Sequence, residues 1–261
     1  MPASVSGDAV RRVVLQQSKR ANVGHIGSGL SVADIVATLY GGVLRGEPSD
    51  PDRDRFVMCK GHAALAVYAA LHLAGRLSAE QLDRYCGDGG HLGVHPNHCL
   101  AGVDFSTGSL GQGLAFAAGA TLGARLRGSQ RRVFALVSDA ECNEGSVWEA
   151  VMFAAHHRLG NLVGIIDVNG QQALGYTDRV MSLEGMEQRW AAFGWDVSSV
   201  DGHDQETLAQ TMAGLTGDRP HVLVAHTTFG KGVSFMEGQI PWHYLPMNDE
   251  QFRLAMSEIG A

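Results

Sequence analysis

The sequence lacks the features that mark membrane, nucleic-acid-binding and disulfide-rich proteins. No apolar run approaches the roughly 20 residues of a membrane span, and no apolar segment precedes a small-residue cleavage site at the N-terminus. The 20 Lys and Arg are outnumbered by 27 Asp and Glu, and no basic block would follow a phosphate backbone. The four Cys residues have no Cys-x-x-Cys spacing. We therefore expect a cytoplasmic protein with reduced thiols and with neither nucleic acid nor membrane as a partner.

Two residue types are abundant instead. The chain of 261 residues contains 34 Gly and 12 His. Glycine at this level without a repeat indicates many tight turns, or backbone that approaches a ligand closely. This composition favours a cofactor site.

Short continuous apolar runs alternate with helical patterns along the chain. Runs without alternation are typical of strands buried on both faces, and the helices between them predict a parallel sheet. Strands are expected at 56–59, 133–138, 162–167, 195–200 and 222–227. Helices are expected at 8–21, 63–74, 109–126, 145–158, 185–193, 204–215 and 248–259. The predicted fold is α/β, a doubly wound and mostly parallel sheet with helices on both faces, in one domain over residues 1–261.

Two segments before the first regular crossover need separate predictions. Ser31 is placed to cap a helix that runs to Leu39, with Asp34 in the role of the acidic partner of a capping box. The stretch from Cys86 to Phe105 is rich in glycine and is expected to be a long loop. Loops of that length inside a compact domain are usually functional or disordered, and its His and Cys residues favour function.

Polar side chains follow two neighbouring predicted strands. Asp139 comes after the run 133–137, and Asn169 comes after the run 162–166. In open parallel sheets, ligands bind beyond the carboxyl ends of the strands. A carboxylate and a carboxamide are hard oxygen ligands that suit Mg²⁺ or Ca²⁺, and Mg²⁺ is usually completed by phosphate oxygens. The pair predicts a phosphorylated cofactor.

Each of these two residues also has an ordinary structural interpretation. Asp139 could balance the dipole of the following helix, and Asn169-Gly170 is a common turn dipeptide. The spacing of 30 residues between Asp139 and Asn169 is that of one βαβ unit, which places both at adjacent strand ends and favours the ligand role.

Seven ordered blocks carry a resemblance to transketolase over nearly the whole chain. Asp139 and Asn169 are similar to the thiamine diphosphate fingerprint, Gly-Asp-Gly followed by Asn after about 30 residues. The other matching segments are 24–27, 54–62, 95–96, 107–113, 144–150 and 230–232 with His243. The resemblance implies the thiamine-diphosphate-binding fold of the diphosphate-binding (PP) domain.

The resemblance also implies roles for individual residues. Asp139, Asn169 and the backbone carbonyl of Gln171 would hold Mg²⁺, or Ca²⁺ or Mn²⁺ in its place, on the diphosphate. By the same resemblance, His62 and the Ala140 amide would contact the diphosphate, and Gly108, Ser109 and Leu110 would contact the aminopyrimidine. His25, His95 and His243 would contact the substrate and the cofactor. Glu144 would take part in a proton link across a subunit interface.

The abundance of histidine agrees with this chemistry. Imidazoles donate or accept protons near neutral pH, and His25, His62, His95 and His243 stand in loops beside glycine or proline, where sites concentrate. The other histidines within helix or strand patterns are assigned structural or solvent roles. These are His72, His156, His157, His203, His221 and His226.

The sequence departs from the family pattern at three places near the expected site. Ser138-Asp139-Ala140 stands where relatives have Gly-Asp-Gly, and Ala would be strained if the turn required a positive φ. Gly24-His25-Ile26-Gly27 lacks the customary proline. Tyr244 follows His243 where glycine is common, which adds bulk near the substrate.

The resemblance ends with the first transketolase domain. A full-size transketolase continues into a pyrimidine-binding domain that carries the catalytic glutamate. The chain is therefore expected to be the N-terminal subunit of a split transketolase, inactive alone. Its expected partner is a C-terminal subunit in a heterotetramer, and its expected activity is transfer of a two-carbon ketol unit from a ketose phosphate or related ketose to an aldose.

Three other interpretations stay open. A related enzyme of a specialised pathway could pass the two-carbon unit to a carrier-protein thiol. A dinucleotide-binding or regulatory subunit is a second possibility, although Gly108-x-x-Gly111-x-Gly113 has the wrong order for Gly-x-Gly-x-x-Gly. A zinc site could use ligands from one loop, but their spacing is poor. The zinc candidates are Cys86, His91, His95, His98 and Cys99.

Overall fold

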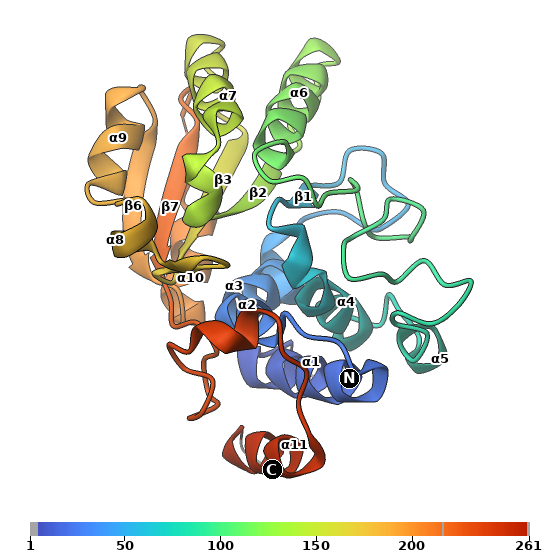
Figure 1. Ribbon diagram of the computed structural model, residues 1–261. Helices are drawn as coiled ribbons and strands as arrows, with labels where there is room; N and C mark the ends of the chain where they lie inside the picture. Colours follow the sequence, from blue (N-terminus) through green and yellow to red (C-terminus); the bar gives the residue numbers. More distant parts are fainter. Residues whose placement is uncertain (1–4, 216, 260–261) are drawn as a thin grey trace.

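The computed structural model describes residues 5–215 and 217–259. A five-stranded sheet runs through the molecule, and every neighbouring pair of strands is parallel (Figure 1). Across the sheet, the strands are β1 (Arg55–Met58), β2 (Val133–Ser138), β3 (Leu162–Val168), β7 (His221–His226) and β6 (Asp196–Asp201). The five predicted strands are confirmed, each within a residue or two at its ends.

Helices cover both faces of the sheet, as a doubly wound fold requires. One core contains Phe56, Phe134 and Ile165 from the sheet, and the opposite core contains Val57, Ala135 and Ile166. The helices on the first face are α1 (Gly7–Ala21), α2 (Ile26–Ser31), α3 (Ala33–Thr38), α4 (Ala64–Leu73) and α10 (Gln205–Ala213). Those on the second are α6 (Gly113–Leu126), α7 (Gly145–His156) and α9 (Met186–Ala192).

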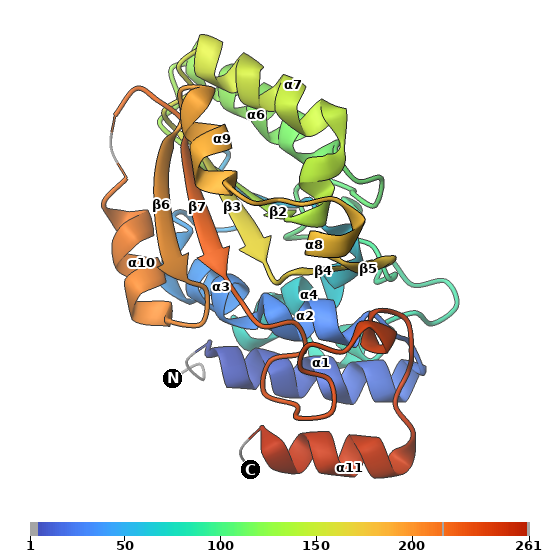
Figure 2. The same cartoon turned by 60° about the vertical axis from the view of Figure 1, so that its left-hand side comes forward.

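Shorter elements complete the chain. The helix α11 (Asp249–Glu258) packs on α1, on the side away from the sheet (Figure 2). Beyond β3, β4 (Gln171–Gln172) and β5 (Gly175–Tyr176) form a small antiparallel hairpin that the sequence did not predict. The others are η1 (Leu39–Val43), η2 (Gly61–Ala63), α5 (Ala79–Leu82), η3 (Ala140–Asn143), α8 (Thr177–Val180) and η4 (Ile240–His243).

A helix lies in the range predicted after Ser31, as α3, but the prediction that Ser31 caps it is wrong. The helical segment already begins at Ile26, and Ser31 is the last residue of α2. Its hydroxyl does not cap a helix but donates to the carboxylate of Asp167, at 2.7 Å from Oδ1. Asp34 accepts a hydrogen bond from His203 at 2.8 Å, and its carboxylate also pairs with the buried guanidinium of Arg11. Both side chains therefore bond to residues that are distant in the sequence, and neither caps the helix as the sequence pattern predicted.

Two further predictions concern the ends of helices. No helix or strand lies between Leu82 and Gly113, which agrees with the long loop expected at 86–105. The helix expected from Ser109 begins at Gly113 instead. Gly108 and Gly111 have φ of 153° and 86°, left-handed backbone that favours glycine and that a helix cannot contain. The glycine-rich segment therefore stays a loop in front of the helix.

Phe134 provides a test of the core on the first face. Its side chain is fully buried in β2, near the middle of the sheet. We expect Phe134→Ala to lower the free energy of unfolding by about 3–5 kcal/mol, because it removes buried contacts and leaves a cavity. The matched control Leu126→Ala, at a side chain that is 78% exposed, should change it by less than about 0.5 kcal/mol. Urea unfolding measures both, and equal effects would contradict this packing.

Candidate active site

The carboxyl ends of β1, β2, β3 and β7 bring together the side chains singled out from the sequence. Ser138 is paired in register with Asp167 on the neighbouring strand, so the segments that follow both strands emerge side by side. Asp139 is 1% exposed, and its carboxylate accepts hydrogen bonds from the Ala140 amide at 2.7 Å and the Gly170 amide at 2.8 Å. The turn after β2 therefore contacts the turn after β3 directly.

The turn at Asp139 has ordinary backbone geometry. Asp139 has φ −55° and ψ −48°, and Ala140 begins the short helix η3. Neither Ser138 nor Ala140 has a positive φ. The replacement of both glycines of the family pattern therefore introduces no backbone strain, because this turn never uses the left-handed region.

Asn169 is held with its carboxamide in one orientation. Its Nδ2 donates to Asp167 Oδ2 at 2.8 Å, and its Oδ1 accepts from the Gln171 amide at 3.0 Å. The buried Oε1 of Gln171 has no hydrogen-bond partner among the residues that the structure describes. Carboxylate and carboxamide oxygens at two adjacent strand ends form a donor set that suits Mg²⁺.

The electrostatics at Asp139 also favour a cation. Burial, followed by the neighbouring charge of Asp167, raises the pKa of the Asp139 carboxyl to about 7. Desolvation and a like charge both disfavour the ionised form. A divalent cation bound to Asp139 would offset both effects, and the residues present therefore fit a metal on a diphosphate.

Three of the four predicted site histidines form a cluster beside this edge. The ring centroids of His25 and His62 are 5.5 Å apart, those of His25 and His243 5.4 Å, and those of His62 and His243 5.1 Å. His25 has φ +60°, a left-handed conformation that is uncommon for a residue with a side chain and that clusters at functional sites. Its buried Nδ1 has no partner within the described chain.

These three imidazoles are held in the neutral form. Burial, followed by the charge of His25, lowers the pKa of His243 to about 4. Burial also lowers the pKa of His25, and it lowers that of His62 well below the usual range, with Lys60 contributing. Neutral imidazole has one N–H donor and one acceptor nitrogen, so the cluster can hydrogen-bond anionic and hydroxyl groups alike.

His95 lies on the loop opposite this cluster. The Tyr68 hydroxyl donates to the His95 carbonyl at 3.1 Å, and a Cβ at Gly108 would stand 3.2 Å from His95 Cδ2. His95, Gly108 and Ser109 line a pocket of about 420 Å³ together with Phe116 of α6. The structure thus brings His95 against the Gly108 loop.

The Gly108–Leu110 loop is held in place by Glu141. The Gly111 amide donates to Glu141 Oε1 at 2.8 Å, and Glu141 is fully buried, which raises its pKa to about 7. Ser109 and Leu110 are exposed. Glu144, predicted as a buried carboxylate at an interface, is exposed in this single chain, and its interface role stays a prediction.

Tyr244 stands at the open side of the histidine cluster. Its side chain is 56% exposed, and its ring centroid is 4.9 Å from that of His243 and 5.8 Å from that of His25. A Cβ at Gly24 would lie 2.0 Å from the Tyr244 carbonyl oxygen, so this close approach requires glycine. Tyr244 is therefore held beside two of the candidate substrate-binding residues.

A buried group of polar residues that the sequence did not predict lies beneath the site. Lys60 is 1% exposed and forms an ion pair with the fully buried Asp167. Ser31 and Thr227 also donate to the Asp167 carboxylate. A charged residue at the end of each of two continuous apolar strands was the available signal, because such side chains are rarely buried without a partner.

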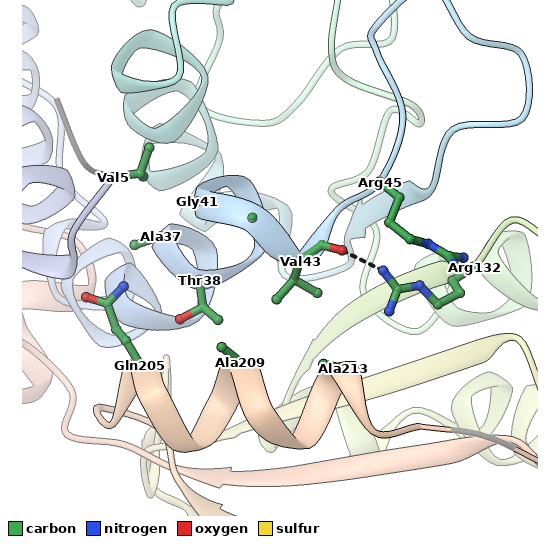
Figure 3. A pocket seen from close by; sticks show the side chains of 11 residues that line it. Val5, Ala37, Thr38, Gly41, Val43, Arg45, Arg132, Gln205, Ala209 and Ala213 are labelled. Carbon is green, nitrogen blue, oxygen red and sulfur yellow. Dashed lines mark hydrogen bonds between the residues drawn. The ribbon is translucent and has the colours of Figure 1, made fainter. Parts of the chain in front are cut away.

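Two other features, a cavity and the zinc candidates of the long loop, were considered as possible sites. A cavity of about 510 Å³ lies between η1 and α10 near Arg132, which precedes β2, so it is at the opposite end of the sheet (Figure 3). Within residues 5–215 and 217–259, no three His, Cys, Asp or Glu side chains are grouped to hold a metal ion. The loop zinc site therefore has no support from the arrangement of these side chains.

Comparison with known proteins agrees with this geometry. The family described as "Transketolase, thiamine diphosphate binding domain" matches residues 3–261. The chain belongs to the transketolase family. Over nearly its whole length the chain is similar to transketolase subunits, and the matched family model is that of a thiamine diphosphate-binding domain. None of its described helices is long and apolar enough to cross a membrane.

The relatives differ in how much of their own length the chain covers. It is 39% identical to an apulose-4-phosphate transketolase subunit of Phocaeicola vulgatus, over 96% of this chain and 91% of that protein. It is 36% identical to a 6-deoxy-6-sulfo-D-fructose transketolase subunit of a Clostridium species, over 97% and 94%. Human transketolase is 37% identical, but only 40% of it is covered.

Solved transketolases have the same fold. The Campylobacter jejuni enzyme superposes with a TM-score of 0.92 at 30% identity, covering 98% of this chain and 42% of the other. The Leishmania mexicana enzyme has a TM-score of 0.91 at 31% identity, with 100% and 42% covered. The transketolase prediction and the α/β fold prediction are confirmed.

A substitution at Gly27 tests the packing of Phe229, whose ring stacks on His243. The Phe229 ring stacks on His243 with centroids 6.2 Å apart, and a Cβ at Gly27 would lie 2.2 Å from Phe229 Cε1. We expect Gly27→Ala to displace Phe229 and lower the free energy of unfolding by about 1–3 kcal/mol through overpacking. Gly119→Ala in α6, where a Cβ meets open space, is the control and should raise it by up to about 1 kcal/mol. Urea unfolding measures both variants. If Gly27→Ala is as stable as the wild type, this packing is contradicted.

His243 tests the electrostatics of the cluster. We expect its imidazole to titrate near pH 4 in the folded chain, against 6.5 for an ordinary histidine. The unfolded chain binds the proton first, so the stability contributed by the neutral ring is complete above about pH 6.5 and is lost as the pH falls towards 4. NMR titration of the ring protons, assigned by their loss in His243→Asn, measures the midpoint. A midpoint at 6.5 or above would show that the ring is not desolvated.

Proposed function

We propose that this chain binds thiamine diphosphate with Mg²⁺ at the carboxyl edge of β1, β2 and β3 and, with a partner subunit, transfers a two-carbon ketol unit between sugars. The observation that supports this most is the pair of buried Asp139 and partly buried Asn169 at adjacent strand ends, with three neutral imidazoles beside it. We also propose that residues 1–261 form a single domain, in keeping with the family match over residues 3–261.

In the proposed site, Asp139, Asn169 Oδ1 and the Gln171 carbonyl hold the metal, for which Ca²⁺ or Mn²⁺ can substitute. Asn169 Oδ1 would leave the Gln171 amide on metal binding, and the Ala140 amide would move from Asp139 to a diphosphate oxygen. His62 donates its N–H to the diphosphate as a neutral ring, because its desolvated site disfavours the imidazolium. Gly108, Ser109 and Leu110 lie along the aminopyrimidine.

When bound, thiamine diphosphate supplies the nucleophilic carbon that breaks and remakes the carbon–carbon bond. His25, His95 and His243 bind the sugar hydroxyls. Neutral His25 and His243 accept a hydroxyl proton at their free ring nitrogen and return it to the product, since neither ring is charged near neutral pH. Tyr244 limits the width of the opening beside them.

The partner is proposed to be a C-terminal transketolase subunit that supplies the pyrimidine-binding domain and its catalytic glutamate, in a heterotetramer. Two relatives carry "subunit" in their names. Glu144, exposed near Gly111 at the start of α7, is placed to meet such a partner, and Phe116 of α6 and Met152 of α7 are exposed apolar side chains that a partner would cover.

The proposed substrates are a ketose phosphate or related ketose and an aldose acceptor. The names of the two relatives contain apulose-4-phosphate and 6-deoxy-6-sulfo-D-fructose, which favours a sugar over a carrier-protein thiol as acceptor. Tyr244 is the feature of this chain that would restrict the choice among sugars.

Asp139→Ala and Asn169→Ala test the proposal in the complex reconstituted with the partner subunit. Each should lower thiamine diphosphate- and Mg²⁺-dependent ketol transfer by at least about 100-fold, because the diphosphate loses a metal ligand. Asp52→Ala is the matched control, since Asp52 is exposed on the loop that enters β1, at the opposite end of that strand. It should leave turnover unchanged.

Two results would contradict the proposal. One is full turnover by the Asp139→Ala/Asn169→Ala double variant. The other is ketol transfer by the purified single chain, because the proposed site is completed by the partner's glutamate.

A further inference from the structure

The carboxylate of Asp167 accepts several side-chain hydrogen bonds at this edge of the sheet. It is fully buried at the end of β3. It accepts hydrogen bonds from side chains on four different segments, beneath the residues proposed to bind the metal. These donors are Lys60 after β1, Ser31 of α2, Thr227 after β7 and Asn169 after β3.

One of these contacts decides which way the Asn169 carboxamide faces. Asn169 Nδ2 lies 2.8 Å from Asp167 Oδ2. The reversed carboxamide would place two acceptor oxygens at that distance with no proton between them. Because the carboxamide is planar, fixing Nδ2 against Asp167 directs Oδ1 to the opposite side, towards the Gln171 amide at 3.0 Å.

Lys60 is the counter-ion that stabilises the buried carboxylate of Asp167. Its chain segment follows β1, and β2 lies between β1 and β3, so the Lys60 side chain reaches past the end of β2 to Asp167. A buried carboxylate without a counter-ion is strongly destabilising. Lys60 pairs with Asp167 and so keeps it ionised as the acceptor of the hydrogen bond from Asn169 Nδ2.

We propose that Asp167 is a positioning residue of the metal site: it orients the Asn169 carboxamide so that Oδ1 is available to the cation together with Asp139, and Lys60 is its fixed counter-ion. This inference rests on the metal site of the proposed function. Asp167 itself does not touch the metal.

A reciprocal exchange of the two side chains tests this role. In Asp167→Asn, the new carboxamide can no longer enforce one orientation of Asn169, and Mn²⁺ affinity should fall by about 10–100-fold, as for other residues that orient metal ligands. In Asp167→Asn/Asn169→Asp, the amide at 167 donates to the carboxylate at 169, so the pairing returns with reversed polarity. Affinity should then recover by at least about tenfold.

The single variant Asn169→Asp separates orientation from added charge. Beside the unchanged Asp167 it places two carboxylates in contact, so we expect it to lower Mn²⁺ affinity, although the same substitution raises affinity in the Asp167→Asn background. This change of sign in a double-mutant cycle is the signature of positioning. Mn²⁺ binding is measured by electron paramagnetic resonance with saturating thiamine diphosphate, on the complex that includes the partner subunit. Circular dichroism gives the Tm of each variant.

Each outcome decides a different claim. An unchanged affinity in Asp167→Asn, or an Asn169→Asp effect of the same sign in both backgrounds, overturns the positioning role. Absence of Mn²⁺ binding by the wild-type complex overturns the proposed function itself. If Asp167→Asn alone unfolds because Lys60 loses its counter-ion, only the two variants that carry Asp167→Asn also receive Lys60→Met, which removes both members of the ion pair, and Asn169→Asp is still expected to raise Mn²⁺ affinity between them.

Discussion

Two carboxylates are buried at neighbouring strand ends, and only one of them has a cation. Asp167 is paired with Lys60, and this ion pair, with the hydroxyl donors, holds the pKa of Asp167 below its usual range although the residue is fully buried. Asp139 has only two backbone amides as hydrogen-bond donors within the described chain, and its pKa is raised to about 7. This imbalance is the constraint on which the rest of the site depends: two carboxylates are buried side by side, and Lys60 forms its ion pair with Asp167.

Hydrogen bonds connect this edge of the sheet to the neighbouring helix and loops. Ser31 and Thr227 link α2 and the segment after β7 to Asp167. The segment after β7 continues to Phe229, whose ring supports His243, and the Gly230 amide donates to the Gly27 carbonyl at 3.1 Å. The ion pair, the proposed metal ligands and the imidazoles thus share one set of contacts. Uncharged imidazoles are suited to this place, because a charged ring would be desolvated beside Lys60.

Much of the fold was predictable from the sequence because it follows from burial. A strand covered on both faces must be a continuous apolar run, and 133–138 and 162–167 differ from the observed strands by at most one residue. The prediction for Ser31 was wrong because a hydroxyl serves a helix cap or a distant carboxylate equally well, and only the tertiary structure decides between them. The hairpin of β4 and β5 has two residues in each strand, too few for any periodicity.

The site was predictable in part for a similar reason. Asp139 and Asn169 follow apolar runs directly, so the chain order alone places them together. Lys60 and Asp167 belong to different crossover units, and their ion pair depends on the order of the strands across the sheet, which the sequence does not state. Glu141, which holds the Gly108 loop through the Gly111 amide, was not predicted because no motif singles it out, and the interface role of Glu144 stays a prediction.

In the proposed site, the oxygens of Asp139 and Asn169 share one divalent cation with a diphosphate. A crystal structure of the complex with thiamine diphosphate and Mn²⁺, with anomalous diffraction recorded for the metal, tests it most directly. A metal peak is expected within about 2.0–2.4 Å of an Asp139 carboxylate oxygen and of Asn169 Oδ1. A metal peak elsewhere, or bound cofactor with Asn169 Oδ1 still accepting the Gln171 amide, would contradict it.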